Sequence, residues 1–168
     1  MKLVALAAFW TFLLDQVTKW LVVHALGLRT RGEIDVLPPF LNFRMAWNRG
    51  VNFGLFQGDS DAGKWLLIGI AVAIIVFVLV WIRREPPSKW GLIGAGLLVG
   101  GALGNVVDRV LYGAVADFLN MSCCGIENPF AFNVADVAIF AGALGLVLFP
   151  GTRKAGGGAR RKSGKKAP

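Results

Sequence analysis

Aspartates set among apolar residues are the first candidates for chemistry in this sequence. Asp108 lies in GALGNVVDR, Asp117 in VADF, and Asp136 ends FNVAD. Two carboxyl groups held close together do not both ionise, so they share one proton, and one acts as a base while the other acts as an acid. Such a pair can activate a water molecule against an amide carbonyl without a cofactor. The sequence therefore favours an aspartyl hydrolase.

Other catalytic chemistries lack the residues that they need. His24 is the only histidine, and Cys123 and Cys124 are adjacent, so the sequence has neither a zinc-binding pattern nor a Ser-His-Asp set. The aspartates also lack the dense alternation of a calcium loop. We expect no metal and no cofactor, with His24 as an interfacial side chain and the two cysteines unbridged to each other.

The composition indicates where these aspartates must work. Apolar residues make up 55% of the 168 residues and charged residues only 17%, against about 25% in soluble domains. The mean hydropathy is +0.60. A disordered chain, a collagen and a disulfide-stapled secreted module are excluded, because the chain is apolar, lacks a Gly-X-Y repeat and has two cysteines. The sequence predicts a membrane protein.

Four segments are long and apolar enough, or nearly so, to cross a membrane as helices, which takes about 20 residues each. They are residues 3–25, 64–82, 90–111 and 134–150. Asp15 and Lys19 interrupt the first segment and no clear cleavage site follows it, so we expect a retained anchor and not a signal peptide.

Basic residues in the connections predict the orientation, because cytoplasmic loops carry the excess of Lys and Arg. Arg83, Arg84 and Lys89 lie between the second and third segments, and a basic tail follows the fourth. Both termini are therefore expected in the cytoplasm. Residues 1–152 are expected to form one domain, and residues 153–168 a disordered basic tail. We interpret the tail as a segment that attracts anionic lipids, and binding of nucleic acid is the less favoured alternative.

The connections 26–63 and 112–133 are expected outside. The first contains IDVLPPFLNF and MAWNRGVNFGLF, whose β-branched and aromatic residues with Gly and Pro predict short strands or an amphipathic platform.

Polar residues cluster at the outer ends of the last two spans. Asn105, Asp108 and Arg109 share one helix face, because they are separated by three and four residues. Asp136 begins the last span and Asp117 lies between the two, so three carboxylates should meet at one level beneath the outer surface.

Small residues should let the third and fourth spans approach closely. They are Gly96, Gly100 and Gly104 on the third span, and Ala138, Ala141, Gly142 and Gly145 on the fourth. Packing explains these residues but does not require the polar ones. Asp15 and Lys19 share a face of the first span, either as a buried structural pair or with a direct chemical role.

Five short blocks, in order, resemble those of the signal peptidase II family, the lipoprotein signal peptidases. They are DQVTK, NRGVNFG, GNVVDR, VADF and FNVADVAI, between positions 15 and 139. Any one block is weak, but the ordered set is highly specific. One departure is Asn52, where the family often has a small residue.

The resemblance implies a bacterial inner-membrane aspartyl endopeptidase that cuts prolipoproteins on the N-terminal side of a diacylglyceryl-modified Cys. It implies that Asp117 and Asp136 are the catalytic pair, a choice that position alone does not make between Asp117 and Asp108. Supporting or substrate-binding roles are implied for Asp15, Lys19, Asn48, Gly50, Asn105, Asp108, Arg109 and Asn133.

The fold implied is mainly α and integral to the membrane, with four transmembrane helices and a small extracytoplasmic β-rich cradle. A short extracytoplasmic helix is implied around Asp117. The partners expected are prolipoproteins and membrane lipids, with the enzyme as a monomer.

Two non-peptidase readings remain. A proton- or cation-coupled transporter could use the same carboxylates as a relay, although its site would lie near the midplane between internal repeats, which this sequence does not show. An assembly protein could use its polar residues only to join helices.

Overall fold

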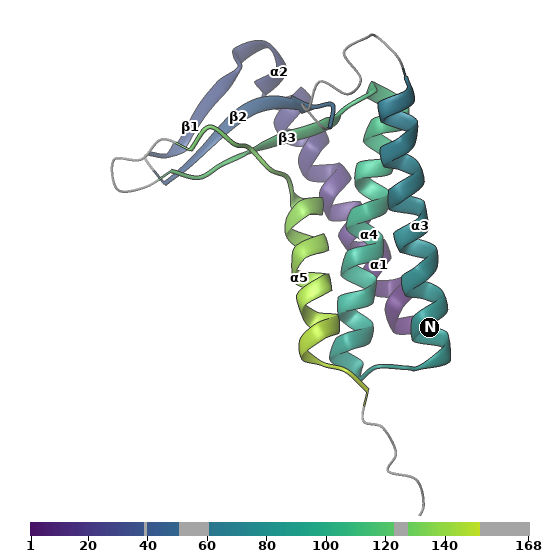
Figure 1. The fold of residues 1–168 in the computed structure, drawn as a ribbon. Coiled ribbons are helices and arrows are strands. Elements are labelled where there is room, and N and C mark those ends of the chain that lie inside the picture. Colours follow the sequence, from purple (N-terminus) through teal and green to yellow (C-terminus); the bar gives the residue numbers. More distant parts are fainter. Residues whose placement is uncertain (39, 51–60, 123–127, 152–168) are drawn as a thin grey trace, which may run out of the picture.

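Long helices run side by side and a small sheet lies at one end of them (Figure 1). The computed structural model of the chain describes residues 1–38, 40–50, 61–122 and 128–151. Within these residues, the long helices are α1 (Lys2–Lys19), α3 (Ala62–Arg84), α4 (Lys89–Tyr112) and α5 (Val134–Leu148). A π-helical stretch, η1 (Trp20–Ala25), continues α1.

Three helices in the described part of the chain are long and apolar enough to cross a membrane: α1 with η1, α3 and α4. Their bounds lie within a few residues of the predicted spans. Helix α5 is apolar but has 15 residues, or about 22 Å at 1.5 Å per residue, which is less than the roughly 30 Å of a bilayer core. The mainly helical fold is thus confirmed, and the fourth predicted span corresponds to the shorter helix α5.

Glycines allow α4 to pack between α1 and α5. We predicted that Gly96, Gly100 and Gly104 serve the contact with the last span. This is wrong for Gly96 and Gly100, where a Cβ would meet residues of α1, whereas a Cβ on Gly104 would meet Asp15 of α1 and also lie 3.7 Å from the Cβ of Ala135 in α5. Helix α5 packs against the face of α4 that carries Gly94. A Cβ at Gly94 would lie only 2.9 Å from the carbonyl oxygen of Gly142 in α5. Successive residues turn by about 100° around a helix, so α4 needs a separate set of small residues for each neighbour.

The sheet is antiparallel, in the order β1 (Glu33–Leu37), β2 (Leu41–Asn48), β3 (Val115–Asn120). It confirms the predicted small β-rich part. A one-turn helix, α2 (Leu28–Arg31), precedes β1. Leu28 and Phe118 are buried together beneath the sheet with Val22 of η1, which joins the sheet to the first helix.

The expected helix around Asp117 is wrong, because this stretch is strand β3. Gly113 ends α4 with φ 73°, a left-handed conformation that favours glycine. The chain then pairs with β2, with Asp117 opposite Ala46 and Val115 opposite Asn48. Pairing with β2 satisfies the backbone groups of this short segment, which a helix of the same length would leave largely unpaired.

The N-terminus and the C-terminal end of α5 lie at the end of the bundle away from the sheet (Figure 1). Several predictions concern positions outside the described residues. These positions are Asn52, Cys123, Cys124 and residues 153–168.

Candidate active site

Asp117 is held in β3 by two amide donors. It is 3% exposed. Asn133 Nδ2 donates to its Oδ1 at 2.6 Å, and Asn48 Nδ2 donates to its Oδ2 at 3.0 Å. The backbone N–H of Gly50 donates to Asn48 Oδ1 at 2.9 Å, so the Asn48 amide presents its NH₂ group to Asp117. Gly50 has φ 96°, which strongly favours glycine at this position.

Asp136 lies in the first turn of α5, where the helix dipole stabilises negative charge. Its Oδ2 accepts from the backbone N–H of Asn133 at 3.3 Å, and its Oδ1 accepts from Asn105 Nδ2 at 2.8 Å. The first of these contacts is half of a capping box, since Asn133 Oδ1 accepts in turn from the backbone N–H of Asp136 at 2.9 Å. The helix start itself therefore orients this carboxylate.

One buried side chain connects the two carboxyl groups. Asn133, which is 0% exposed, uses Oδ1 to cap α5 next to Asp136 and uses Nδ2 to reach Asp117. The same Nδ2 also donates to Asn105 Oδ1 at 3.2 Å. Asp117 and Asp136, from a strand and a helix 19 positions apart, are thus held in one hydrogen-bond network.

Burial raises the pKa of Asp117 to about 6, and the negative charge of Asp136 acts in the same direction. The hydrogen bonds from Asn48 and Asn133, followed by the charge of Lys19, partly offset this rise. Asp117 therefore keeps its proton at pH values where an ordinary aspartate is ionised, as a pair with one shared proton requires.

Arg109 lies beside this network. Its Nη1 donates to the backbone oxygen of Asn105 at 3.3 Å, and its positive charge acts on Asp136, Asp117 and Asp108. Among the described residues, none accepts a hydrogen bond from its buried Nε atom. Arg109 can therefore donate to a further acceptor at this site.

A buried ion cluster lies next to the two amides. Lys19 Nζ is 2.8 Å from Asp15 Oδ2 and 2.8 Å from Asp108 Oδ2, and both carboxylates are almost fully buried. Lys19 Nζ also donates to Asn105 Oδ1 at 3.2 Å. Asp108 thus pairs with Lys19, while Asp117 shares its network with Asp136, a division that the spacing of the aspartates did not indicate.

The structure brings all ten predicted site residues together at the sheet end of the bundle. The sequence analysis missed Gln16, whose Nε2 donates at 3.1 Å to Asp15 Oδ2 and at 3.1 Å to Asp108 Oδ1. Its signals were its place in the DQVTK block and its polarity within an apolar span, between Asp15 and Lys19.

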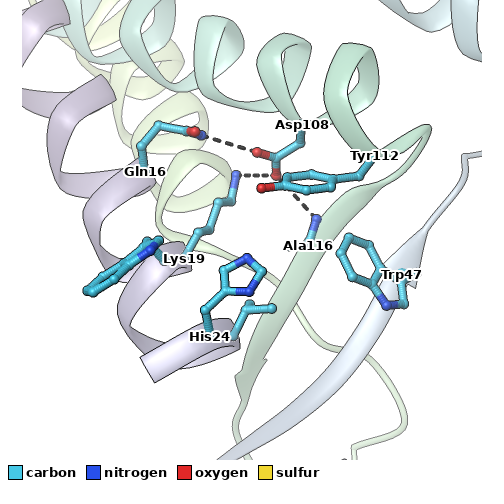
Figure 2. A pocket seen from close by; sticks show the side chains of 9 residues that line it. Gln16, Lys19, His24, Trp47, Asp108, Tyr112 and Ala116 are labelled. Atoms are coloured by element: carbon cyan, nitrogen blue, oxygen red, sulfur yellow. Dashed lines mark hydrogen bonds and ion pairs between the residues drawn. The ribbon is translucent and has the colours of Figure 1, made fainter. Parts of the chain in front are cut away.

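A cavity of about 130 Å³ lies beside the ion cluster and not at the aspartate pair. Figure 2 shows Lys19, Gln16 and Asp108 facing it, with His24 below and the rings of Tyr112 and Trp47 on the other side. Neither Asp117 nor Asp136 lines it. His24 is exposed here, in agreement with an interfacial position.

The fold and the site define a class, a small helical membrane enzyme with buried aspartates at one end of its bundle. A solved structure described as a bacterial membrane enzyme at 1.9 Å resolution is 28% identical, with a TM-score of 0.74, over 88% of this chain and 92% of that one. A second, at 2.3 Å resolution, is 27% identical with a TM-score of 0.70, over 88% of this chain and 87% of that one.

Sequence comparisons identify the family of the chain. The model of the signal peptidase (SPase) II family matches residues 7–150, and the chain belongs to this family of peptidases. A lipoprotein signal peptidase of Methylorubrum extorquens is 44% identical over 87% of this chain and 82% of its own length. One of Rhodopseudomonas palustris is 40% identical over 87% of this chain and 90% of its own length.

Proposed function

We propose that this protein is an aspartyl endopeptidase of the bacterial inner membrane that removes signal peptides from prolipoproteins. It cuts on the N-terminal side of the diacylglyceryl-modified Cys, with Asp117 and Asp136 as the catalytic pair. The observation that carries the proposal is the side chain of Asn133, which caps the helix turn holding Asp136 and donates to Asp117 at 2.6 Å. The relatives named lipoprotein signal peptidase support the substrate class.

The environments of the two aspartates support separate roles. Asp117 is buried and its pKa is raised to about 6, so it retains a proton to higher pH than an ordinary aspartate does, and we assign it the role of the acid. Asp136 lies in the first turn of α5, where its carboxyl oxygens accept from a backbone N–H and from Asn105, so both oxygens are held in place. Asp136 takes a proton from the attacking water, while Asp117 donates its proton to the oxygen of the scissile carbonyl. The roles then reverse as the intermediate collapses and the amine leaves.

Arg109 and Asn48 are suited to hold the substrate. Arg109 has a buried Nε that none of the described residues uses, and it lies within electrostatic range of both aspartates. Asn48 is exposed and its Nδ2 contacts Asp117 at 3.0 Å, so it is accessible beside the pair. Each would donate a hydrogen bond to a substrate carbonyl and orient the substrate. Loss of either residue should therefore reduce turnover less than loss of either aspartate.

We propose four transmembrane spans, with both termini in the cytoplasm and the aspartate pair near the periplasmic face. The N-terminus and the C-terminal end of α5 lie away from the sheet, at the same end of the bundle as the connection between α3 and α4 (Figure 1). Helix α3 ends in Arg83 and Arg84, and α4 begins at Lys89, so these basic residues lie at that end. The faces of α3 and α5 away from α4 expose apolar side chains, such as Phe77 at 68% and Phe140 at 75%, which suits contact with lipid. The acyl chains of the substrate would remain in lipid while its cleavage site reaches the pair.

Two isosteric variants test the proposal. Asp117→Asn and Asp136→Asn, made separately, should each insert into the membrane and abolish release of the signal peptide from a lipid-modified precursor in detergent. Asp61→Asn is the matched control, because its carboxylate is 76% exposed and pairs only with Lys64 at 2.8 Å among the described residues. Wild-type cleavage by either active-site variant would end the proposal.

The same assay separates the proposal from the two other readings. A transporter needs an ion gradient for its activity, and an assembly protein has no turnover. Cleavage by the purified protein in detergent, where no gradient exists, therefore supports the peptidase alone.

A further inference from the structure

The residue directly before each aspartate of the pair is anchored by a buried carboxylate. The backbone N–H of Ala116 donates to Asp108 Oδ2 at 3.2 Å, and the backbone N–H of Ala135 donates to Asp15 Oδ1 at 2.9 Å. Asp108 thus fixes the strand at the position before Asp117. Asp15 fixes the helix at the position before Asp136.

These two anchoring carboxylates are joined to each other twice. Lys19 Nζ lies 2.8 Å from an oxygen of each. Gln16 Nε2 donates at 3.1 Å to Asp15 Oδ2 and at 3.1 Å to Asp108 Oδ1. Asp15, Gln16, Lys19 and Asp108 therefore form one continuous link from β3 to the first turn of α5.

We propose that Gln16 is a positioning residue that closes this link and so sets the separation of Asp117 and Asp136. The inference rests on the proposed function, because it concerns the geometry of the same pair. Lys19 and Gln16 hold Asp15 against Asp108, and each anchoring carboxylate holds the backbone that carries one member of the pair.

Lys19 does not satisfy every oxygen of this link. The two carboxyl groups lie close together in a buried place, where like charges repel strongly and each oxygen needs a donor. The amide of Gln16 adds two donors and no charge. Among the described residues it is the only donor to Asp108 Oδ1, so its loss leaves a buried carboxylate oxygen without a partner.

The separation of the pair has a kinetic signature. The charge of Asp136 favours the protonated form of Asp117, and this effect weakens as the two carboxyl groups move apart. A looser link therefore lowers the upper apparent pKa of the pair, and the alkaline limb of the pH profile moves to lower pH. A substitution that merely lowered the amount of folded enzyme would leave that limb in place.

The test uses Gln16→Leu in the full-length enzyme. Leucine keeps the volume and removes the donors, whereas alanine would open the site to water from the neighbouring cavity, which Gln16 lines. We expect kcat to fall by about 10²-fold, as for a displacement of roughly 1 Å, with KM changed less than twofold. The alkaline limb should move to lower pH.

Thr18→Val is the matched control. Thr18 lies on the same helix turn, and its hydroxyl donates only within α1, to the oxygens of Leu14 and Asp15 at 2.8 and 2.9 Å. This variant should keep the wild-type kcat and pH profile. Gln16→Met, which is unbranched and flexible, serves as a second variant and should behave like Gln16→Leu.

Wild-type kcat in both Gln16 variants, or a lower kcat with an unmoved alkaline limb, would overturn the proposal. Failure of both variants to fold would also overturn it, because Gln16 would then act on stability alone. Activity of Asp117→Asn would instead refute the proposed function, so the two failures are distinguishable.

Discussion

Substitution of Asn133 separates two tasks that one side chain performs. Its Oδ1 caps α5 and its Nδ2 donates to Asp117. Asn133→Ser keeps a capping oxygen but loses the amide donor, while Asn133→Ala loses both. Serine and asparagine are equally good caps, and replacing a cap by alanine costs about 1 kcal/mol. We therefore expect the alanine variant to melt about 2–4 °C below the serine variant.

The loss of activity should be shared by both variants. A hydrogen bond to a charged group contributes about 1.5–3 kcal/mol, and the contact to Asp117 is short at 2.6 Å. At the upper end of that range, kcat/KM falls about a hundredfold. Because this hydrogen bond lowers the pKa of Asp117, which burial has raised, its loss should move the alkaline limb of the pH profile to higher pH than in the wild type.

The assay is cleavage of a lipid-modified precursor in detergent between pH 4 and 9, with melting followed in parallel. Asn133→Ser with wild-type kcat/KM and an unshifted limb would refute the bridging role. A serine variant that melts like the alanine variant would refute the capping role. The shift expected here is opposite in sign to that of Gln16→Leu, so a general loss of fold cannot imitate both.

Two further predictions concern stability. The raised pKa of Asp117 means that its proton stabilises the fold fully below the unfolded value near 3.8 and that this contribution, about 3 kcal/mol, is lost as pH rises through about 6. The melting temperature should therefore fall between pH 4 and 7 in the wild type, and a fall of the same size in Asp117→Asn would contradict the assignment. Gly104→Ala should destabilise by about 1–3 kcal/mol, because its Cβ would contact the Asp15 carboxylate, whereas Gly69→Ala, with open space around its Cβ, should not. Equal melting temperatures for the two glycine variants would show that the close approach to Asp15 is unimportant.

The length of the apolar segments predicted the helices to within a few residues, because a helix that can cross a membrane is set by local composition. Local pattern was insufficient for Asp117, which lies in a strand because β2 offers it a partner 67 or more positions away in the chain. The same holds for Gly96 and Gly100, whose spacing predicted a close helix contact but not that α1 would be the neighbour. Partners of this kind depend on tertiary packing, which spacing does not encode.

The carboxylates were easier to find than the groups that orient them. Aspartate within an apolar stretch is conspicuous because it is costly there. Gln16 is neutral and lies beside two more conspicuous residues, so only its contacts with Asp15 and Asp108 distinguish it. Sequence reasoning therefore finds the carboxylates of such a site more readily than the neutral residues that support them.

The three asparagines of the site share a physical principle. An amide can turn over and exchange its donor and acceptor, so its orientation must be fixed by a neighbour that has only one of these functions. The backbone N–H of Gly50 fixes Asn48, the ammonium of Lys19 fixes Asn105, and the backbone N–H of Asp136 fixes Asn133, each by donating to Oδ1.

Each NH₂ group must then point to a carboxylate of the pair. Asn48 and Asn133 donate to Asp117, and Asn105 donates to Asp136. Lys19, which is not itself a hydrogen-bond donor to Asp136, thus determines that the NH₂ end of Asn105 faces Asp136. The amides of Asn48 and Asn133 favour the charged form of Asp117, while burial opposes its ionisation, and in the proposed mechanism this balance lets Asp117 both hold and release a proton.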